Sequence, residues 1–131
     1  MRTLTSHISR FLLILIFLFG VSVGNAAGKP GGRLIVIRTA NFGWNLAANL
    51  KIDGRTVMNI VQGRRYDHFI PAGRHVLTVS AVPNIELRQP TSVTVNVRPG
   101  RTYIFTAGWD SDYVYLRPTT LSPAEMAKLG L

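Results

Sequence analysis

Apolar and polar side chains alternate with a period of two along most of this sequence. The clearest case is Ser92–Val97, in which the three valines share one side of the run and the polar residues share the other. Such alternation is typical of a β-strand with one face against a core and the other in solvent. Similar runs are separated by segments rich in Pro, Gly and Asp. The predicted strands cover residues 33–38, 46–52, 56–61, 65–70, 75–82, 92–97, 102–109 and 113–117.

Turn residues between these runs indicate how the strands connect. Asp53-Gly54 lies between two apolar runs and predicts a hairpin with a type I′ turn, because both central residues of that turn need positive φ. Pro71–Gly73 predicts a second turn, since Pro fixes φ and Gly accepts positive φ. We expect strand 102–109 to pair with strand 92–97 across a turn at Arg98–Arg101.

The longest irregular stretch, Pro83–Pro90, is bounded by two prolines that cannot donate within a central ladder, so we expect it to cross between two sheets. Ser122, Pro123 and Glu125 have the spacing of a capping box and predict a short C-terminal helix that Gly130 could end. Strands at intervals of about 8–12 residues are typical of a sandwich or barrel. The predicted fold is therefore all-β: a small antiparallel β-sandwich of about seven or eight strands with a short C-terminal helix.

Residues 1–26 have the composition of a secretory signal peptide. Its three parts are a basic start, the apolar run Phe11–Val23 and small residues before a polar segment. Cleavage after Ala26 meets the small-residue requirement better than cleavage after Ala27. The alternative is an uncleaved anchor, but the run is shorter than the roughly 20 apolar residues that span a bilayer. The expected organisation is a signal peptide (1–26), a flexible linker (27–32) and one domain (33–131).

The sequence contains no cysteine, hence no lipobox and no disulfide. We expect an exported protein, periplasmic or secreted and not a lipoprotein, whose domain is held together by its core alone. Removing the signal peptide takes Arg2 and Arg10 from the 15 basic residues and leaves 13 against 6 acidic ones, a net charge of +7. That charge favours anionic partners such as phosphorylated glycans, anionic lipid headgroups or teichoic-type polymers, while export argues against nucleic acid. The alternative is a charged surface that serves solubility alone.

Several segments occur in an order shared with a known group of domains. The segments are Leu34–Arg38, Ile52–Gly54, Gly63 before Tyr66, Ile70–His75 and Pro99–Phe105. In this order and spacing the sequence resembles the PEGA-like β-sandwich domains, and most closely a family of exported bacterial proteins filed as a domain of unknown function. The resemblance covers residues 33–117 and implies an immunoglobulin-like or prealbumin-like sandwich in the cell envelope. It supplies no catalytic or binding residues, and the missing lipobox cysteine departs from similar proteins that look lipid-anchored.

Five arginines are candidates for a binding surface. Arg64, Arg65 and Arg74 flank one predicted strand, and Arg98 and Arg101 border a turn. If the two turns lie at the same end of the sandwich, these arginines form a basic edge for an anionic ligand. The alternative is that charged turns protect the sheet edges from aggregation.

Aromatic residues offer a second candidate surface. Trp44 lies in an irregular segment and Trp109 ends a predicted strand, so that both could belong to a stacking platform for sugars. In the alternative interpretation, Trp109 and the tyrosines close the ends of the core, because aromatic side chains dominate the core energetics of small domains. The other members of the platform would be Phe42, Tyr113 and Tyr115, with Arg38 or Arg117 nearby for anionic groups.

No motif of a catalytic or metal site stands out in the sequence. His68 and His75 lack the spacing of zinc ligands, and we expect His75 to bond turn backbone or to pack at the rim of the sandwich. The two carboxylates of Asp110–Asp112 are too few for calcium, which takes about six to eight oxygens, and they fit a β-turn. No Gly-x-Ser-x-Gly elbow is present. We therefore expect no cofactor, no metal and no enzymatic activity.

The charge balance and the missing motifs together predict a non-enzymatic binding or scaffolding module that contacts an anionic envelope polymer or another envelope protein. The alternative is a small hydrolase or glycan-modifying accessory protein whose site is assembled from distant residues. An enzyme should have a concave pocket with convergent titratable groups, whereas a binding module should have a shallow basic or aromatic face or an open strand edge.

Overall fold

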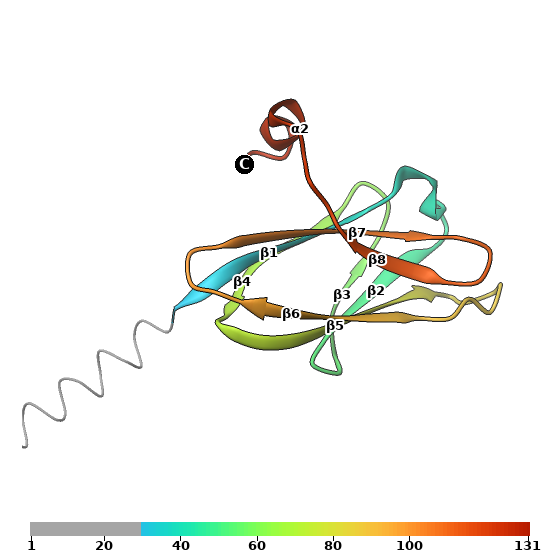
Figure 1. Cartoon of the computed structure of the whole chain (residues 1–131). Helices are drawn as coiled ribbons and strands as arrows, with labels where there is room; N and C mark the ends of the chain where they lie inside the picture. The colour runs from blue at the N-terminus through green and yellow to red at the C-terminus, as the bar shows by residue number, and fades with distance from the viewer. Residues whose placement is uncertain (1–29) are drawn as a thin grey trace, which may run out of the picture. The chain divides into compact units, whose positions relative to one another are not determined.

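All eight predicted runs form strands in the computed structural model, which describes residues 30–131 (Figure 1). The predicted signal peptide, residues 1–26, lies outside the described residues. Within residues 30–131, no helix is long and apolar enough to cross a membrane. In chain order the elements are β1 (Gly31–Arg38), the 3-10 helix η1 (Ala40–Phe42), β2 (Ala47–Ile52), β3 (Arg55–Ile60), β4 (Arg65–Pro71), β5 (Gly73–Val82), β6 (Thr91–Val97), β7 (Thr102–Trp109), β8 (Val114–Pro118) and α2 (Pro123–Lys128).

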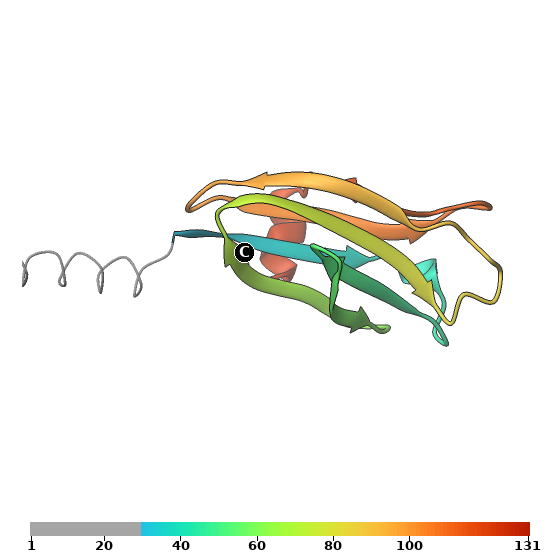
Figure 2. The ribbon, with the colours of Figure 1, turned by 90° about the horizontal axis from the view of Figure 1, so that it is seen from below.

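The strands form two four-stranded sheets that face each other (Figures 1 and 2). One sheet has the order β4-β1-β7-β8 and the other has the order β3-β2-β5-β6. Every neighbouring pair is antiparallel except β1 and β7, which run parallel with Val36 beside Phe105. The predicted all-β sandwich with a short C-terminal helix is confirmed, and one parallel pair interrupts its otherwise antiparallel arrangement.

Two of the predicted connections are wrong. β5 and β6 pair within one sheet, with Leu77 beside Val93, so Pro83–Pro90 joins neighbouring strands and does not cross between sheets. The turn at Arg98–Arg101 makes a crossing instead, because β6 and β7 belong to different sheets. The alternation of apolar and polar residues cannot distinguish a hairpin from a crossing between sheets. In either case every second side chain of the next strand faces the core, whichever sheet that strand joins.

Inward-facing residues of both sheets form the core. Leu34 and Val36 of β1, Leu50 of β2, and Leu77 and Val79 of β5 are completely buried, and each such side chain stabilises the fold by roughly 1.5–3 kcal/mol. The sandwich closes this core with its own strands, so we expect it to fold without the residues that precede it. The other buried members are Phe42, Ala48, Ile60, Tyr66, Ile70, Ala81, Val95, Val97, Phe105, Ala107, Val114 and Leu116.

The hairpin between β2 and β3 has the predicted backbone, with φ of 52° at Asp53 and 81° at Gly54. The Asp53 carboxylate accepts a hydrogen bond from the Val76 N–H (2.9 Å) and lies 2.6 Å from Nδ1 of His75. The bond from Val76 and then the one from His75 lower the pKa of Asp53, and the bond to Asp53 raises the pKa of His75. Nε2 of His75 lies 2.8 Å from the Pro71 carbonyl, so this histidine bonds turn backbone, as predicted.

β1 begins at Gly31, so its first two residues, Gly31 and Gly32, belong to the segment 27–32 that the sequence predicts to be a flexible linker. Gly31 pairs with Pro71 and Gly32 pairs with Ile70 in β4. The missing side chains explain the early start: a Cβ on Gly31 would lie 2.5 Å from the Ile70 carbonyl oxygen, and one on Gly32 would lie 2.7 Å from Val97. Glycine at these positions is therefore required for close packing and does not indicate a flexible linker.

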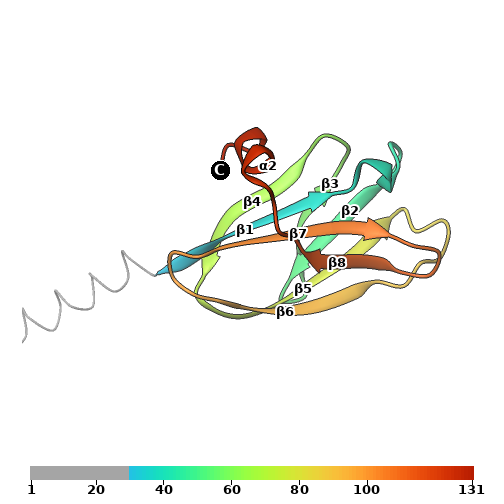
Figure 3. The ribbon, with the colours of Figure 1, turned by 45° about the horizontal axis from the view of Figure 1, so that its top comes forward.

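The C-terminal helix α2 lies over the outer face of the β4-β1-β7-β8 sheet (Figures 1 and 3). Ser122 and Glu125 form the predicted capping box at its start. The segment that leads to it is fixed to β7, because the Thr119 N–H donates to the Ile104 carbonyl at 2.8 Å, and Leu121 is buried. The segment before the helix and Leu129 after it therefore contact the rest of the domain, whereas the helix itself buries no residue.

Candidate functional site

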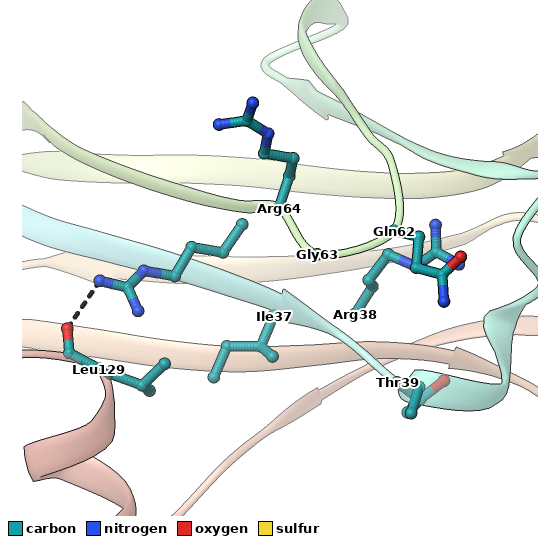
Figure 4. A pocket seen from close by; sticks show the side chains of 9 residues that line it. Ile37, Arg38, Thr39, Gln62, Gly63, Arg64 and Leu129 are labelled. Carbon is teal, nitrogen blue, oxygen red and sulfur yellow. Dashed lines mark hydrogen bonds between the residues drawn. The ribbon is translucent and has the colours of Figure 1, made fainter.

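A groove of about 650 Å³ opens where the end of β1 meets the β3–β4 connection (Figure 4). Its third wall is Leu129, which follows α2. The lining combines three arginines, Arg38, Arg64 and Arg65, with apolar groups that include Ile37 and Leu129. Residues far apart in the sequence thus create one concentration of positive charge around a partly apolar floor.

Arg38 is buried at this groove although it carries a charge, with 8% of its surface exposed. Its guanidinium donates hydrogen bonds to the backbone carbonyls of Gly43 (2.5 Å), Leu46 (2.9 Å) and Ile60 (3.4 Å). Burial lowers its pKa, but an arginine in a protein stays protonated. No ion pair joins it to a carboxylate in the described part of the chain. Its charge is solvated by carbonyl dipoles and not neutralised.

Arg65 is held in place at the wall of the groove. One nitrogen of its guanidinium donates to the Leu129 carbonyl at 2.6 Å, the dashed line in Figure 4, and lies 3.5 Å from Asp67. Asp67 is engaged mainly by Arg33, whose guanidinium makes two hydrogen bonds of 2.8 Å to its two carboxylate oxygens. These bonds from Arg33 lower the pKa of Asp67. Because Asp67 pairs mainly with Arg33, its carboxylate neutralises little of the charge of Arg65.

Arg64 lies at the open side of the groove. It follows the tight connection after β3, which is closed by a hydrogen bond from the Arg64 N–H to the Val61 carbonyl (3.0 Å). Its side chain is exposed and reaches away from β1 (Figure 4). Among residues 30–131, no hydrogen bond or ion pair engages its guanidinium. Arg64 is therefore free to meet a ligand that lies in the groove.

The groove continues into a second hollow of about 380 Å³ beside α2. The two share Ile37, Arg38, Thr39 and Leu129, and the second adds the charged side chains of Lys128 and Glu125. The Thr39 hydroxyl at the junction is buried and has no hydrogen-bond partner within the described residues. The combined depression is elongated and carries cations along its length.

The structure divides the five predicted arginines into two groups. Arg64 and Arg65 line the groove, whereas Arg74 lies at the other end of β4, where its partner in β6 is Asn96, next to the turn that carries Arg98 and Arg101. The expectation of one basic edge made of all five is therefore wrong. Arg64 precedes β4, Arg65 is its first residue and Arg74 follows it, so the length of that strand separates the first two from the third.

The two tryptophans do not form a shared stacking platform. Trp109 stacks on Phe42 with 5.2 Å between ring centroids, and the Arg88 guanidinium covers it at 3.8 Å. Because Phe42 belongs to the core, Trp109 closes one end of the core, as the alternative interpretation predicted. Trp44 is 81% exposed and contributes to no such stack. Tyr115 lies under Arg117 at 4.0 Å, and Tyr113 is exposed and makes no ring stack with another aromatic residue within residues 30–131.

The other candidates of the sequence have structural contacts. Oδ1 of Asp110 accepts hydrogen bonds from the N–H groups of Asp112 (3.0 Å) and Tyr113 (2.8 Å), which is the predicted turn. The ring of His68 lies beside that of Tyr66, 4.8 Å between centroids. In residues 30–131, no group of three or more His, Cys, Asp or Glu side chains is placed to hold a metal ion.

Sequence reasoning named Arg64 and Arg65 but missed how they meet Arg38 and Leu129. A signal for Arg38 was present: it has the same parity in β1 as Leu34 and Val36, which predicts that it faces inward. Arg38 was considered only as a neighbour of the aromatic residues. The contribution of Leu129 depends on where α2 packs, which no local pattern reports.

Comparison of this chain with family models, with curated proteins and with solved structures found no match. The resemblance to the PEGA-like domains therefore stays a prediction. The function of this chain is therefore inferred from the geometry of the groove.

Proposed function

We propose that this chain is an exported, non-enzymatic binding module of the cell envelope that holds an anionic envelope polymer in the groove between β1, the β3–β4 connection and Leu129. The observation that carries the proposal is the buried, unneutralised charge of Arg38 next to Arg64 and Arg65. Buried charges are ordinarily paired with an opposite charge or bound to a ligand. A bound anion would supply the counter-charge that the protein does not.

The chemistry of the lining favours binding over catalysis. It contains three guanidinium groups, the amide of Gln62 and the hydroxyl of Thr39, and it contains no carboxylate and no histidine. A general acid or base therefore has no obvious source in the groove, whereas arginine binds phosphate and carboxylate through paired hydrogen bonds. This composition supports a ligand that is held and not converted.

The shape of the depression favours an extended ligand. Four cationic side chains line it, from Arg64 to Lys128, against one carboxylate, Glu125 beside α2, and the lining also includes the apolar side chains of Ile37 and Leu129. A polymer that alternates phosphate groups with short carbon segments matches both features. Phosphodiester-linked polyols and phosphorylated glycans belong to this class, whereas a neutral glycan would bring no negative charge to the three arginines.

The proposal predicts that Arg64→Ser weakens binding of a poly(glycerol phosphate) oligomer about tenfold, because one charge-assisted hydrogen bond is worth roughly 1.5–3 kcal/mol. The measurement is fluorescence anisotropy of the labelled oligomer with the purified domain, residues 27–131, at low and high salt. Wild-type affinity should fall as salt increases, since exposed charges are screened.

Arg98→Ser is the matched control, because it removes the same charge from an exposed turn outside the groove. It should change the affinity less than about twofold. Equal losses in both variants would show that net charge alone attracts the oligomer. Equal binding of uncharged dextran would also contradict the proposal.

A further inference from the structure

Exposed apolar side chains gather at the end of the sandwich where the β1–β2, β5–β6 and β7–β8 connections lie (Figure 2). Trp44 is 81% exposed, Ile85 70%, Leu87 81% and Tyr113 52%. We call these four residues the apolar tip. The loops that carry them adjoin: Gln89 of the β5–β6 connection forms a bridge with Tyr113, and Asn45, next to Trp44, lines one hollow together with Ile85. Clustered exposed apolar side chains on a soluble domain mark a contact surface.

The loop that carries Ile85 and Leu87 is fixed by polar contacts on both sides. The Asn84 side chain donates to the Arg88 carbonyl (2.9 Å) and accepts from the Arg88 N–H (3.0 Å). The Arg88 guanidinium pairs with Glu86 at 2.7 Å and donates to the Asp110 carbonyl at 2.7 Å. The loop is therefore held in one shape, with two large aliphatic side chains in solvent. Such preorganisation lowers the entropy cost of binding.

The backbone at Leu87 supports this interpretation. Its φ is +53°, in the left-handed region that costs an ordinary residue about 1–2 kcal/mol relative to glycine. The side chain gains no burial within the domain in return. Backbone strain that the fold itself does not use is a feature of binding sites. A contact outside the chain would give this leucine the burial that it lacks here.

The charges near the apolar tip are acidic, because Glu86, Asp110 and Asp112 are exposed on the same loops. Arg88 is the basic residue on these two loops; its guanidinium pairs with Glu86 and covers the ring of Trp109, so Asp110 and Asp112 carry the negative charge that it leaves unpaired. An anionic bilayer or polymer would be repelled by these carboxylates. The occupant of the tip must therefore present positive charge together with apolar surface.

The opposite end of the same molecule presents both. Arg74, Arg98 and Arg101 are exposed there, and Phe69, two residues before the end of β4, is 75% exposed. We call these four residues the arginine end. The ten-residue strand β5, about 30 Å long, runs from this end to the tip (Figure 1). The acids close to the arginine end are already engaged, Asp53 by His75 and Asp67 by Arg33.

We propose that the apolar tip of one copy of this chain docks on the arginine end of a second copy, head to tail. Apolar side chains would meet Phe69 and the aliphatic parts of the arginines, and the acidic border of the tip would face the three guanidinium groups. A tip-to-tip pair is disfavoured because it would bring Asp110 and Asp112 of one copy against the same two carboxylates of the other. A head-to-tail contact uses two different surfaces, so it extends into chains of molecules or closes into rings. The contact is independent of the groove and of its proposed ligand.

The first test is sedimentation velocity of the purified domain, residues 27–131, from about 10 μM to 1 mM, the range expected for a small interface. The sedimentation coefficient should rise with concentration, and it should rise less at high salt. Leu87→Asp should abolish the rise. Because Leu87 is exposed, this variant should keep the wild-type melting temperature, and Ile85→Asp provides a second variant of the same kind.

The decisive test mixes two variants that cannot assemble alone. Leu87→Asp keeps an intact arginine end, and Arg98→Glu/Arg101→Glu keeps an intact tip. Each should be monomeric by itself, and an equimolar mixture should form dimers and nothing larger. Arg64→Glu/Arg117→Glu, with the same change of charge at other sites, should assemble like the wild type.

Three outcomes would overturn the proposal. A wild-type domain that stays monomeric across the concentration range would show that a second copy is not the occupant of the tip. An arginine-end variant that still forms dimers by itself would indicate a tip-to-tip contact. A mixture that remains monomeric would show that the two surfaces do not bind each other.

Discussion

Replacing Arg38 by methionine is expected to lower the free energy of unfolding by about 2–4 kcal/mol, although methionine is apolar and similar in length. The three carbonyls of Gly43, Leu46 and Ile60 would lose their donor, and each buried polar group left unpaired costs roughly 1–3 kcal/mol. Removing a buried charge that has no partner offsets part of this loss. The net effect should nevertheless be destabilising, because Arg38 links the end of β1 to the loop before β2 and to the end of β3.

Urea unfolding followed by tryptophan fluorescence measures this effect. Arg117→Met is the control, because that arginine is exposed and only covers the ring of Tyr115; it should change the stability by less than about 0.5 kcal/mol. If both variants were equally stable, water would be satisfying the three carbonyls. Arg38 would then have no structural role, and its burial would no longer mark the groove as a site of unneutralised charge.

Replacing Gly32 by valine is expected to lower the melting temperature by about 10–20 °C, which corresponds to roughly 2–4 kcal/mol for a domain of this size. A Cβ at this position would lie 2.7 Å from a methyl group of Val97 and 3.0 and 3.1 Å from the carbonyl oxygens of Arg101 and Arg98. Two of these three neighbours are backbone atoms of the β6–β7 turn, which cannot move without shifting both sheets.

Thermal unfolding followed by circular dichroism tests this prediction. Thr94→Val places the same side chain at an exposed position of β6 and should leave the melting temperature within a few degrees of wild type. A Gly32→Val variant that melts like the wild type would restore the original expectation of a flexible linker through residue 32.

The sequence was sufficient to predict the strands and the faces that they bury. Alternation placed Leu77, Val79, Val95 and Val97 in the core, where they lie. The Asp53-Gly54 turn and the Ser122 cap were also predictable, because each depends on residues only a few positions apart. These features are local, and local chemistry determines them.

The order of the strands was not predictable in the same way. β1 pairs with β7, nearly 70 positions further along the chain, and nothing in either run selects that partner. The errors at Pro83–Pro90 and Arg98–Arg101 have this cause, since both segments can close a hairpin or cross between sheets. The composition of the groove follows from the same long-range placement, because Arg38, Arg64 and Leu129 come together only through the topology.

Gly31 and Gly32 show a second reason why a prediction from sequence alone can fail. Glycine next to proline is typical of a linker when it is considered as sequence alone. In the fold these two residues are in β1 because other backbone passes too close for any side chain. A requirement for close packing and a preference for flexibility select the same residue, and only the tertiary structure separates them.

The central claim is that an anion binds at Arg38, Arg64 and Arg65, and an NMR titration tests it most directly. The arginine side-chain N–H signals of the labelled domain would be followed while poly(glycerol phosphate) oligomer is added. The account predicts saturable shifts for these three arginines and little change for Arg74, Arg98 and Arg101, which lie outside the groove. Shifts confined to those latter three, or uniform small shifts across all exposed arginines, would contradict it.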